Sequence, residues 1–116
     1  MEMKIERLAG FLPLWLLLLL ALAVLELIGD TFAKQFAVTG EIKNSLLAIL
    51  FVVAGNLCWQ HMLRQGVPLG TGGVLFGVTV ALGMLVIGAV FYGESLTPLK
   101  MLGAGFGLVA LVLLSL

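Results

Sequence analysis

Charged side chains are scarce in this sequence. Asp, Glu, Lys and Arg make up only 10% of the 116 residues, whereas a soluble domain carries about 25%. A surface that faces water on all sides cannot be built from so few charges. Six basic residues also balance six acidic ones, which leaves no net positive field to attract nucleic acid, so we expect no nucleic-acid partner.

The residues that usually hold metals or perform nucleophilic chemistry are almost missing. The chain has one cysteine, Cys58, and one histidine, His61, so it can form neither an internal disulfide nor a cluster of such ligands. The glycine-rich stretch Gly70–Gly73 lacks the Lys-Ser/Thr pair that a phosphate-binding loop requires. We therefore expect no enzyme, no bound metal and no cofactor.

Long apolar runs are what the sequence does contain, since 62% of its residues are hydrophobic. A helix needs about 20 mostly apolar residues to cross a bilayer. Runs of that kind predict an all-α integral membrane protein, a single domain over 1–116 with four transmembrane helices. The expected spans are about 10–34, 45–63, 68–92 and 98–116.

The first run follows basic residues, as a secretory signal peptide does. Cleavage of this segment is therefore an alternative to a retained helix. Its length and the lack of an obvious small-residue cleavage site favour a retained first helix.

Basic residues do not assign the chain an orientation in the membrane. Four spans would place three of them on each side, namely Lys4, Arg7 and Arg64 against Lys34, Lys43 and Lys100. The rule that positive loops stay in the cytoplasm favours neither side when the numbers are equal. Either the span boundaries are displaced or the chain inserts both ways round. Two copies in opposite orientations would form an antiparallel, dual-topology dimer with a site near the bilayer midplane.

Glycines recur at a spacing that suits helix packing in lipid. Gly73 and Gly77 are four apart in the third span, and Gly103 and Gly107 are four apart in the fourth. Such pairs let helix backbones approach closely. In the third span the glycines predict either a deformable hinge or simple close packing, and both interpretations remain open.

Glu26 lies near the middle of the first span, where a charged side chain costs several kcal/mol. Burial in a dry environment disfavours the charged form, so we expect Glu26 to hold a proton until water or a cation arrives. In a dimer two Glu26 side chains would titrate as a pair. The alternative is a protonated, hydrogen-bonded glutamic acid that only fixes helix packing.

Two further polar residues are candidates for the same site. Asp30 follows Glu26 by one turn and precedes Lys34 by another, so it either forms a helix pair with Lys34 or lines the cavity as a second acid. Asn56 lies near mid-depth of the second span and is either an interhelical hydrogen-bonding group or a substrate contact.

Three landmarks resemble the small multidrug resistance family of the drug/metabolite transporter superfamily. They are Glu26–Thr31 in the first span, Val67–Gly70 before the third, and Phe91–Leu96 with Lys100–Gly103 around the last turn. The resemblance covers about residues 14–116. It implies a multi-pass protein of the bacterial inner membrane and a dual-topology antiparallel dimer in which Glu26 binds protons and a cationic substrate in turn.

The third span departs from that family's pattern. Positions that hold aromatic residues in the family's drug exporters correspond here to Gly73 and Phe76, and Asp30 replaces a small hydroxyl residue. Phe76 alone forms a poor cage for quaternary ammonium, which is recognised by aromatic faces. The resemblance therefore implies a substrate site with Glu26, Asp30, Asn56 and Phe76, but not broad export of quaternary ammonium compounds.

Three functions remain open from the sequence. The first is a proton-coupled antiporter or exporter of a small cationic compound. The second is a flippase subunit for a lipid or lipid-linked sugar. The third is a non-transporting membrane subunit that assists assembly. The expected partners are protons, a small-molecule substrate, membrane lipids, and a second copy of the chain or a paralogue.

Overall fold

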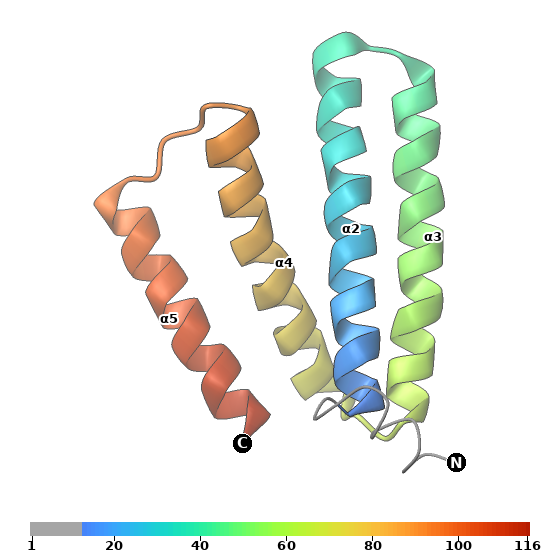
Figure 1. Cartoon of the computed structure of the whole chain (residues 1–116), viewed down its shortest axis with the longest axis vertical. Coiled ribbons are helices and arrows are strands. Elements are labelled where there is room, and N and C mark those ends of the chain that lie inside the picture. Colours follow the sequence, from blue (N-terminus) through green and yellow to red (C-terminus); the bar gives the residue numbers. More distant parts are fainter. Residues whose placement is uncertain (1–12) are drawn as a thin grey trace. The chain divides into compact units, whose positions relative to one another are not determined.

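The structure is a computed structural model and describes residues 13–116. Four α-helices make up nearly all of this part of the chain (Figure 1): α2 (Leu14–Thr39), α3 (Ile42–Arg64), α4 (Leu69–Phe91) and α5 (Pro98–Ser115). The all-α class predicted from the sequence is therefore confirmed for the described residues. The first three residues of the expected first span, 10–12, lie outside them.

Three helices, α2, α3 and α4, are long and apolar enough to cross a membrane. Helix α5 is also apolar but shorter, and its 18 residues give a length of about 27 Å. This is slightly less than the thickness of a bilayer's hydrocarbon core, about 30 Å. The chain therefore has the helices of a multi-pass membrane protein, with α5 at the short end of the range.

Helices α2 and α3 both extend beyond their expected spans. Helix α2 continues to Thr39, past residue 34, and α3 begins at Ile42, before residue 45. Polar residues mark the edge of the hydrocarbon but do not end a helix, because its backbone hydrogen bonds are made internally wherever it lies. The turn between the helices is reduced to two residues. One of them, Gly40, adopts the left-handed conformation at φ 72° and donates its N–H to Phe36 O.

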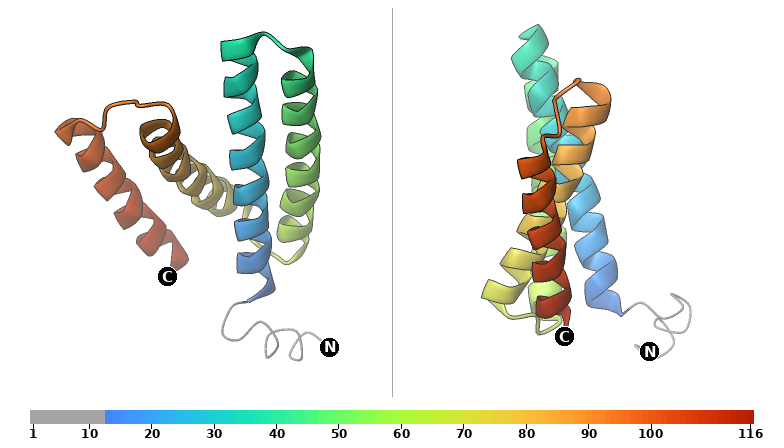
Figure 2. Two further views of the ribbon diagram at one scale, coloured as in Figure 1. Left: turned by 45° about the horizontal axis from the view of Figure 1, so that its top comes forward. Right: turned by 90° about the vertical axis from the view of Figure 1, so that its left-hand side faces the viewer.

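Helices α2 and α3 form an antiparallel hairpin whose helices lie side by side (Figure 1, Figure 2). Its buried residues come from both helices and include Leu19, Leu22 and Ala23 of α2 and Ala48 and Met62 of α3. Near the turn, the rings of Phe32 and Phe51 stack with their centroids 5.8 Å apart. Small side chains at the interface allow this close approach of the two helices.

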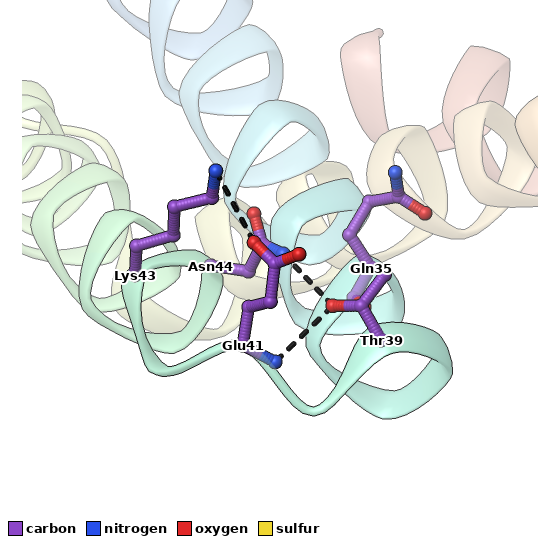
Figure 3. A network of polar contacts seen from close by, with 5 residues as sticks. All are labelled: Gln35, Thr39, Glu41, Lys43 and Asn44. Atoms are coloured by element: carbon purple, nitrogen blue, oxygen red, sulfur yellow. Dashed lines mark hydrogen bonds and ion pairs between the residues drawn. The ribbon is translucent and has the colours of Figure 1, made fainter.

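The turn of this hairpin is fixed by the hydroxyl of Thr39 (Figure 3). Thr39 Oγ1 donates to Gln35 O at 2.8 Å. It also accepts from the backbone N–H of Glu41 at 3.2 Å and from Asn44 Nδ2 at 3.1 Å. Asn44 is buried, whereas the ion pair of Lys43 with Glu41 is exposed. One hydroxyl therefore links the end of α2 to the first turn of α3.

Helices α4 and α5 belong to a second compact unit of the chain, which begins at Gly70. Hydrogen bonds hold both ends of the connection between these two helices. Gly93, at φ 65°, allows Glu94 N to donate back to Gly88 O at 3.0 Å. At the start of α5, Thr97 accepts a hydrogen bond from Lys100 N through its side chain, and Pro98 occupies the first turn.

Candidate functional site

Glu26 lies halfway along α2 and is half-buried. Leu22, Glu26 and Gly29 follow one another at spacings of four and three residues, which places all three on one face of the helix. Leu22 and Gly29 are buried, and this face packs against α3. The carboxyl group is therefore attached to the face of α2 that forms the helix interface, at mid-depth of the hairpin.

The side chain of Glu26 lies against a glycine of the neighbouring helix. A Cβ atom added to Gly55 of α3 would lie 3.7 Å from Glu26 Cγ, 3.7 Å from Leu25 Cβ and 3.4 Å from Leu22 Cδ1. The methylene groups of Glu26 thus pack against the α3 backbone at Gly55, where no side chain intervenes, and Leu22 and Leu25 are their apolar neighbours. A methyl group at position 55 would be in ordinary van der Waals contact with these methylene groups, whereas a side chain longer than alanine would take the space that they occupy.

The next turn of α2 is held tightly against α3. A Cβ atom on Gly29 would lie 3.2 Å from Ala48 O and 3.2 Å from Phe51 Cβ. The first of these atoms belongs to the backbone and cannot rotate away. Together with the stack of Phe32 on Phe51, this contact fixes the helix just beyond Glu26.

Asp30 is half-buried and lies one turn beyond Glu26 on α2. The neighbouring hydroxyl of Thr31 donates to Leu27 O at 2.8 Å, within its own helix. Lys34 lies a further turn along and is exposed. The structure thus brings Glu26 and Asp30 to consecutive turns of one helix, as their spacing in the sequence predicts.

Asn56 follows Gly55 in the sequence but lies on an exposed part of α3. Its Oδ1 accepts a hydrogen bond from Gln60 Nε2 at 3.1 Å. One turn along, His61 Nδ1 donates to Leu57 O at 2.8 Å. Within this hairpin Asn56 therefore pairs along its own helix, while the adjacent Gly55 contacts Glu26.

Phe76 is half-buried on α4, in the second unit. Three of the four glycines predicted to pack or bend, Gly73, Gly77 and Gly103, have no described atom within 4 Å of where a Cβ would be, apart from the adjacent backbone of their own helix. Gly107 does have such a neighbour, because its Cβ position lies 3.2 Å from Val78 Cγ1. Among these four glycines, only Gly107 makes a close contact within the described chain.

The closest glycine contacts within the hairpin were not predicted from the sequence. They belong to Gly29 and Gly55. A signal was present, because Gly29 follows Leu22 by seven residues and Gly55 follows Ala48 by seven, and two turns bring a residue back to the same face of a helix. Spacing does not, however, tell which face meets the partner helix.

Among residues 13–116, no group of three or more His, Cys, Asp or Glu side chains could hold a metal ion. Cys58 is a free, half-buried thiol. Comparison of the sequence with protein-family models found no match, and comparison with curated proteins found none either. The arrangement on which a function can be argued is the pair of carboxyl groups on α2.

Proposed function

We propose that this protein is a proton-coupled secondary transporter of a small cationic compound, in which Glu26 binds the proton and the substrate in turn. One observation carries the proposal. A carboxyl group lies at the midpoint of a membrane-length apolar helix, against the glycine of a neighbouring helix and among apolar side chains. Ionisable groups at such depth are costly and typically mark ion or substrate pathways.

Exchange follows from the environment of Glu26. A neutral carboxylic acid is tolerated in a dry, apolar interface, whereas the carboxylate requires water or a cation beside it. A cation that reaches Glu26 therefore replaces the proton, and departure of the cation allows a proton to return. Because one carboxyl group cannot hold both, the two fluxes are coupled. Asp30, one turn away, adds a second acidic group for the cation to contact.

The active unit in this proposal is an antiparallel, dual-topology dimer in the bacterial inner membrane. The hairpin of α2 and α3 alone leaves Glu26 only half-buried, so further helices must cover the site, and in this proposal a second chain supplies some of them. The open faces of Gly73 and Gly77 offer places where another helix fits closely. The likeness to the small multidrug resistance family supports the same arrangement.

Transport by purified protein in liposomes tests this function. We expect an imposed proton gradient to drive uptake of a cationic substrate by the unmodified protein, and Glu26→Gln to abolish it, because glutamine cannot exchange a proton. Glu41→Gln is the matched control, since Glu41 lies at the exposed turn and its replacement should leave transport unchanged. Gradient-driven transport by Glu26→Gln would contradict the proposal. Lipid redistribution in place of cation transport would favour a flippase.

A further inference from the structure

A largely open apolar cleft of about 300 Å³ lies between helices α4 and α5 within the second unit. Val78 and Leu85 mark its two ends on α4, and Gly107 and Lys100 mark them on α5. Lys100 is its one charged lining residue. The seven residues between the ends correspond to about 10 Å of helix, less than half of a hydrocarbon core about 30 Å thick. On α4 the cleft reaches Val78, near the middle of Leu69–Phe91, so it extends from the connection side to about mid-depth of the helix.

The cleft is closed at one end and open at the other. At Gly107 the two helices are in contact, since a Cβ there would lie 3.2 Å from Val78 Cγ1 and 3.8 Å from Leu82 Cδ2. One turn nearer the start of α5, a Cβ on Gly103 would have no neighbour within 4 Å. The helices thus diverge toward residues 92–97. This connection joins the end of α4 to the start of α5, where the apolar sequence is interrupted and the chain reaches the membrane surface.

A positive charge lies at the open end. Lys100 Nζ donates to Ser95 O at 3.2 Å, and the lysine backbone N–H is held by Thr97 Oγ1 at 3.2 Å. An ammonium group has three N–H donors, so two remain for a ligand. The hydrogen bonds hold this charge at the mouth of the cleft.

A negative charge lies at the same end. Glu94 folds back over Gly88, where a Cβ would be only 2.6 Å from Glu94 Oε1. Gly88 lies one turn beyond Leu85 toward the connection, so Glu94 lies past the open end of the cleft and does not line it. The open end therefore has one positive side chain, Lys100, in its lining and one negative side chain, Glu94, in the adjoining connection.

We propose that this cleft binds one molecule of phosphatidylethanolamine. An acyl chain fills the apolar space beside Gly103, the lipid phosphate pairs with Lys100, and the lipid ammonium pairs with Glu94. A headgroup with both charges matches the mouth, whereas a net anionic headgroup would face the Glu94 carboxylate with no cation to offer it. A helix of a second copy would place apolar side chains against both charges and leave them unpaired.

Native mass spectrometry of the full-length protein, with palmitoyl-oleoyl phosphatidylethanolamine added to the detergent, tests the site. We expect one retained lipid, and Gly103→Leu should lower its retention about tenfold by filling the cleft. Gly105→Leu is the matched control, because Gly105 also has no neighbour within 4 Å but does not line the cleft. Circular dichroism checks that both variants keep their helical content.

Charge removal provides an independent readout. Lys100→Gln should weaken phosphatidylethanolamine binding about fivefold, and Glu94→Gln should remove the preference for phosphatidylethanolamine over phosphatidylglycerol. Equal retention by Gly103→Leu and Gly105→Leu, or equal binding of the two lipids by the unmodified protein, would overturn the proposal. A further test uses the Gly103→Cys variant in a Cys58→Ser background. Formation of a disulfide between two copies of this variant, to the same extent with and without added phosphatidylethanolamine, would also overturn the proposal. None of these readouts depends on transport, so the lipid site and the proposed function can fail separately.

Discussion

Glycine has two different roles at the interface of α2 and α3. At Gly29 the missing side chain is a steric requirement, since a Cβ would lie 3.2 Å from the backbone oxygen of Ala48. At Gly55 the neighbours of a Cβ would be 3.4 to 3.7 Å away, which is ordinary van der Waals contact. The two positions therefore differ in what they tolerate, although both are glycines in apolar helices.

Alanine substitution distinguishes these roles. We expect Gly29→Ala to lower the free energy of unfolding by about 1–3 kcal/mol, because overpacking against a fixed backbone atom forces the helices apart. Gly55→Ala should leave stability unchanged or slightly raised, since its methyl group fits. Unfolding of the purified protein in mixed micelles, followed by circular dichroism, measures both. Equal destabilisation by the two substitutions would contradict the assigned contacts.

Glu26 and Asp30 could be identified from the sequence because a charge within an apolar run is visible without knowing the fold. The neighbour of Glu26 could not be identified. Finding Gly55 requires the register of α3 against α2, and that register is set by how small and large side chains interlock across the interface. Asn56 lies near the middle of α3, the depth expected from the sequence, and within the hairpin it is exposed and bonded to Gln60.

The turn between α2 and α3 shows how a single hydroxyl stabilises an element boundary. Thr39 Oγ1 is the acceptor for Asn44 Nδ2, and Asn44 is only 8% exposed. Loss of this acceptor would leave a buried amide group without its partner. The exposed ion pair of Lys43 with Glu41 lies beside it but has water available to both charges.

Substitution of Thr39 tests the weight of this hydrogen bond. We expect Thr39→Val to destabilise the hairpin by about 1–3 kcal/mol, the cost of a buried donor without an acceptor. Lys43→Ala should change stability by less than about 1 kcal/mol, because exposed ion pairs contribute little. Thermal unfolding of both variants in detergent provides the comparison. A larger effect of Lys43→Ala than of Thr39→Val would contradict this interpretation of the turn.

Helix ends were predicted better in the second unit than in the first. Pro68 and Pro98 mark the starts of α4 and α5 in the sequence, and the helices begin at Leu69 and Pro98. Pro13 directly precedes α2, but no proline marks the C-terminal end of α2 or the start of α3. Their limits were instead placed where charged residues begin, and a helix can continue through such residues once it has left the hydrocarbon.

The distribution of basic residues agrees with insertion in two orientations. In the first hairpin Lys34 and Lys43 lie toward the turn and Arg64 lies at the opposite end, while Lys4 and Arg7 are outside the described residues. A balance of three against three favours neither orientation. The prediction of a dual-topology dimer therefore rests on charge and on the likeness to a family.

Labelling of single cysteines tests this topology. In a Cys58→Ser background, Glu41→Cys places a thiol at the turn of the first hairpin and Gln65→Cys places one at its opposite end; both positions are exposed. We expect a membrane-impermeant maleimide to label about half of each variant from either side of the membrane, as two equally populated orientations require. Complete labelling of one variant from one side, and of the other from the opposite side, would establish a single orientation and contradict dual topology.

The central claim is that Glu26 holds a proton that a cationic ligand displaces. The most direct measurement is proton release from purified protein in detergent and weak buffer when a panel of cationic compounds is added. We predict release on addition of at least one compound, none from Glu26→Gln, and unchanged release from Glu41→Gln. Binding of a cation by the unmodified protein without proton release, or equal release from Glu26→Gln, would contradict the account.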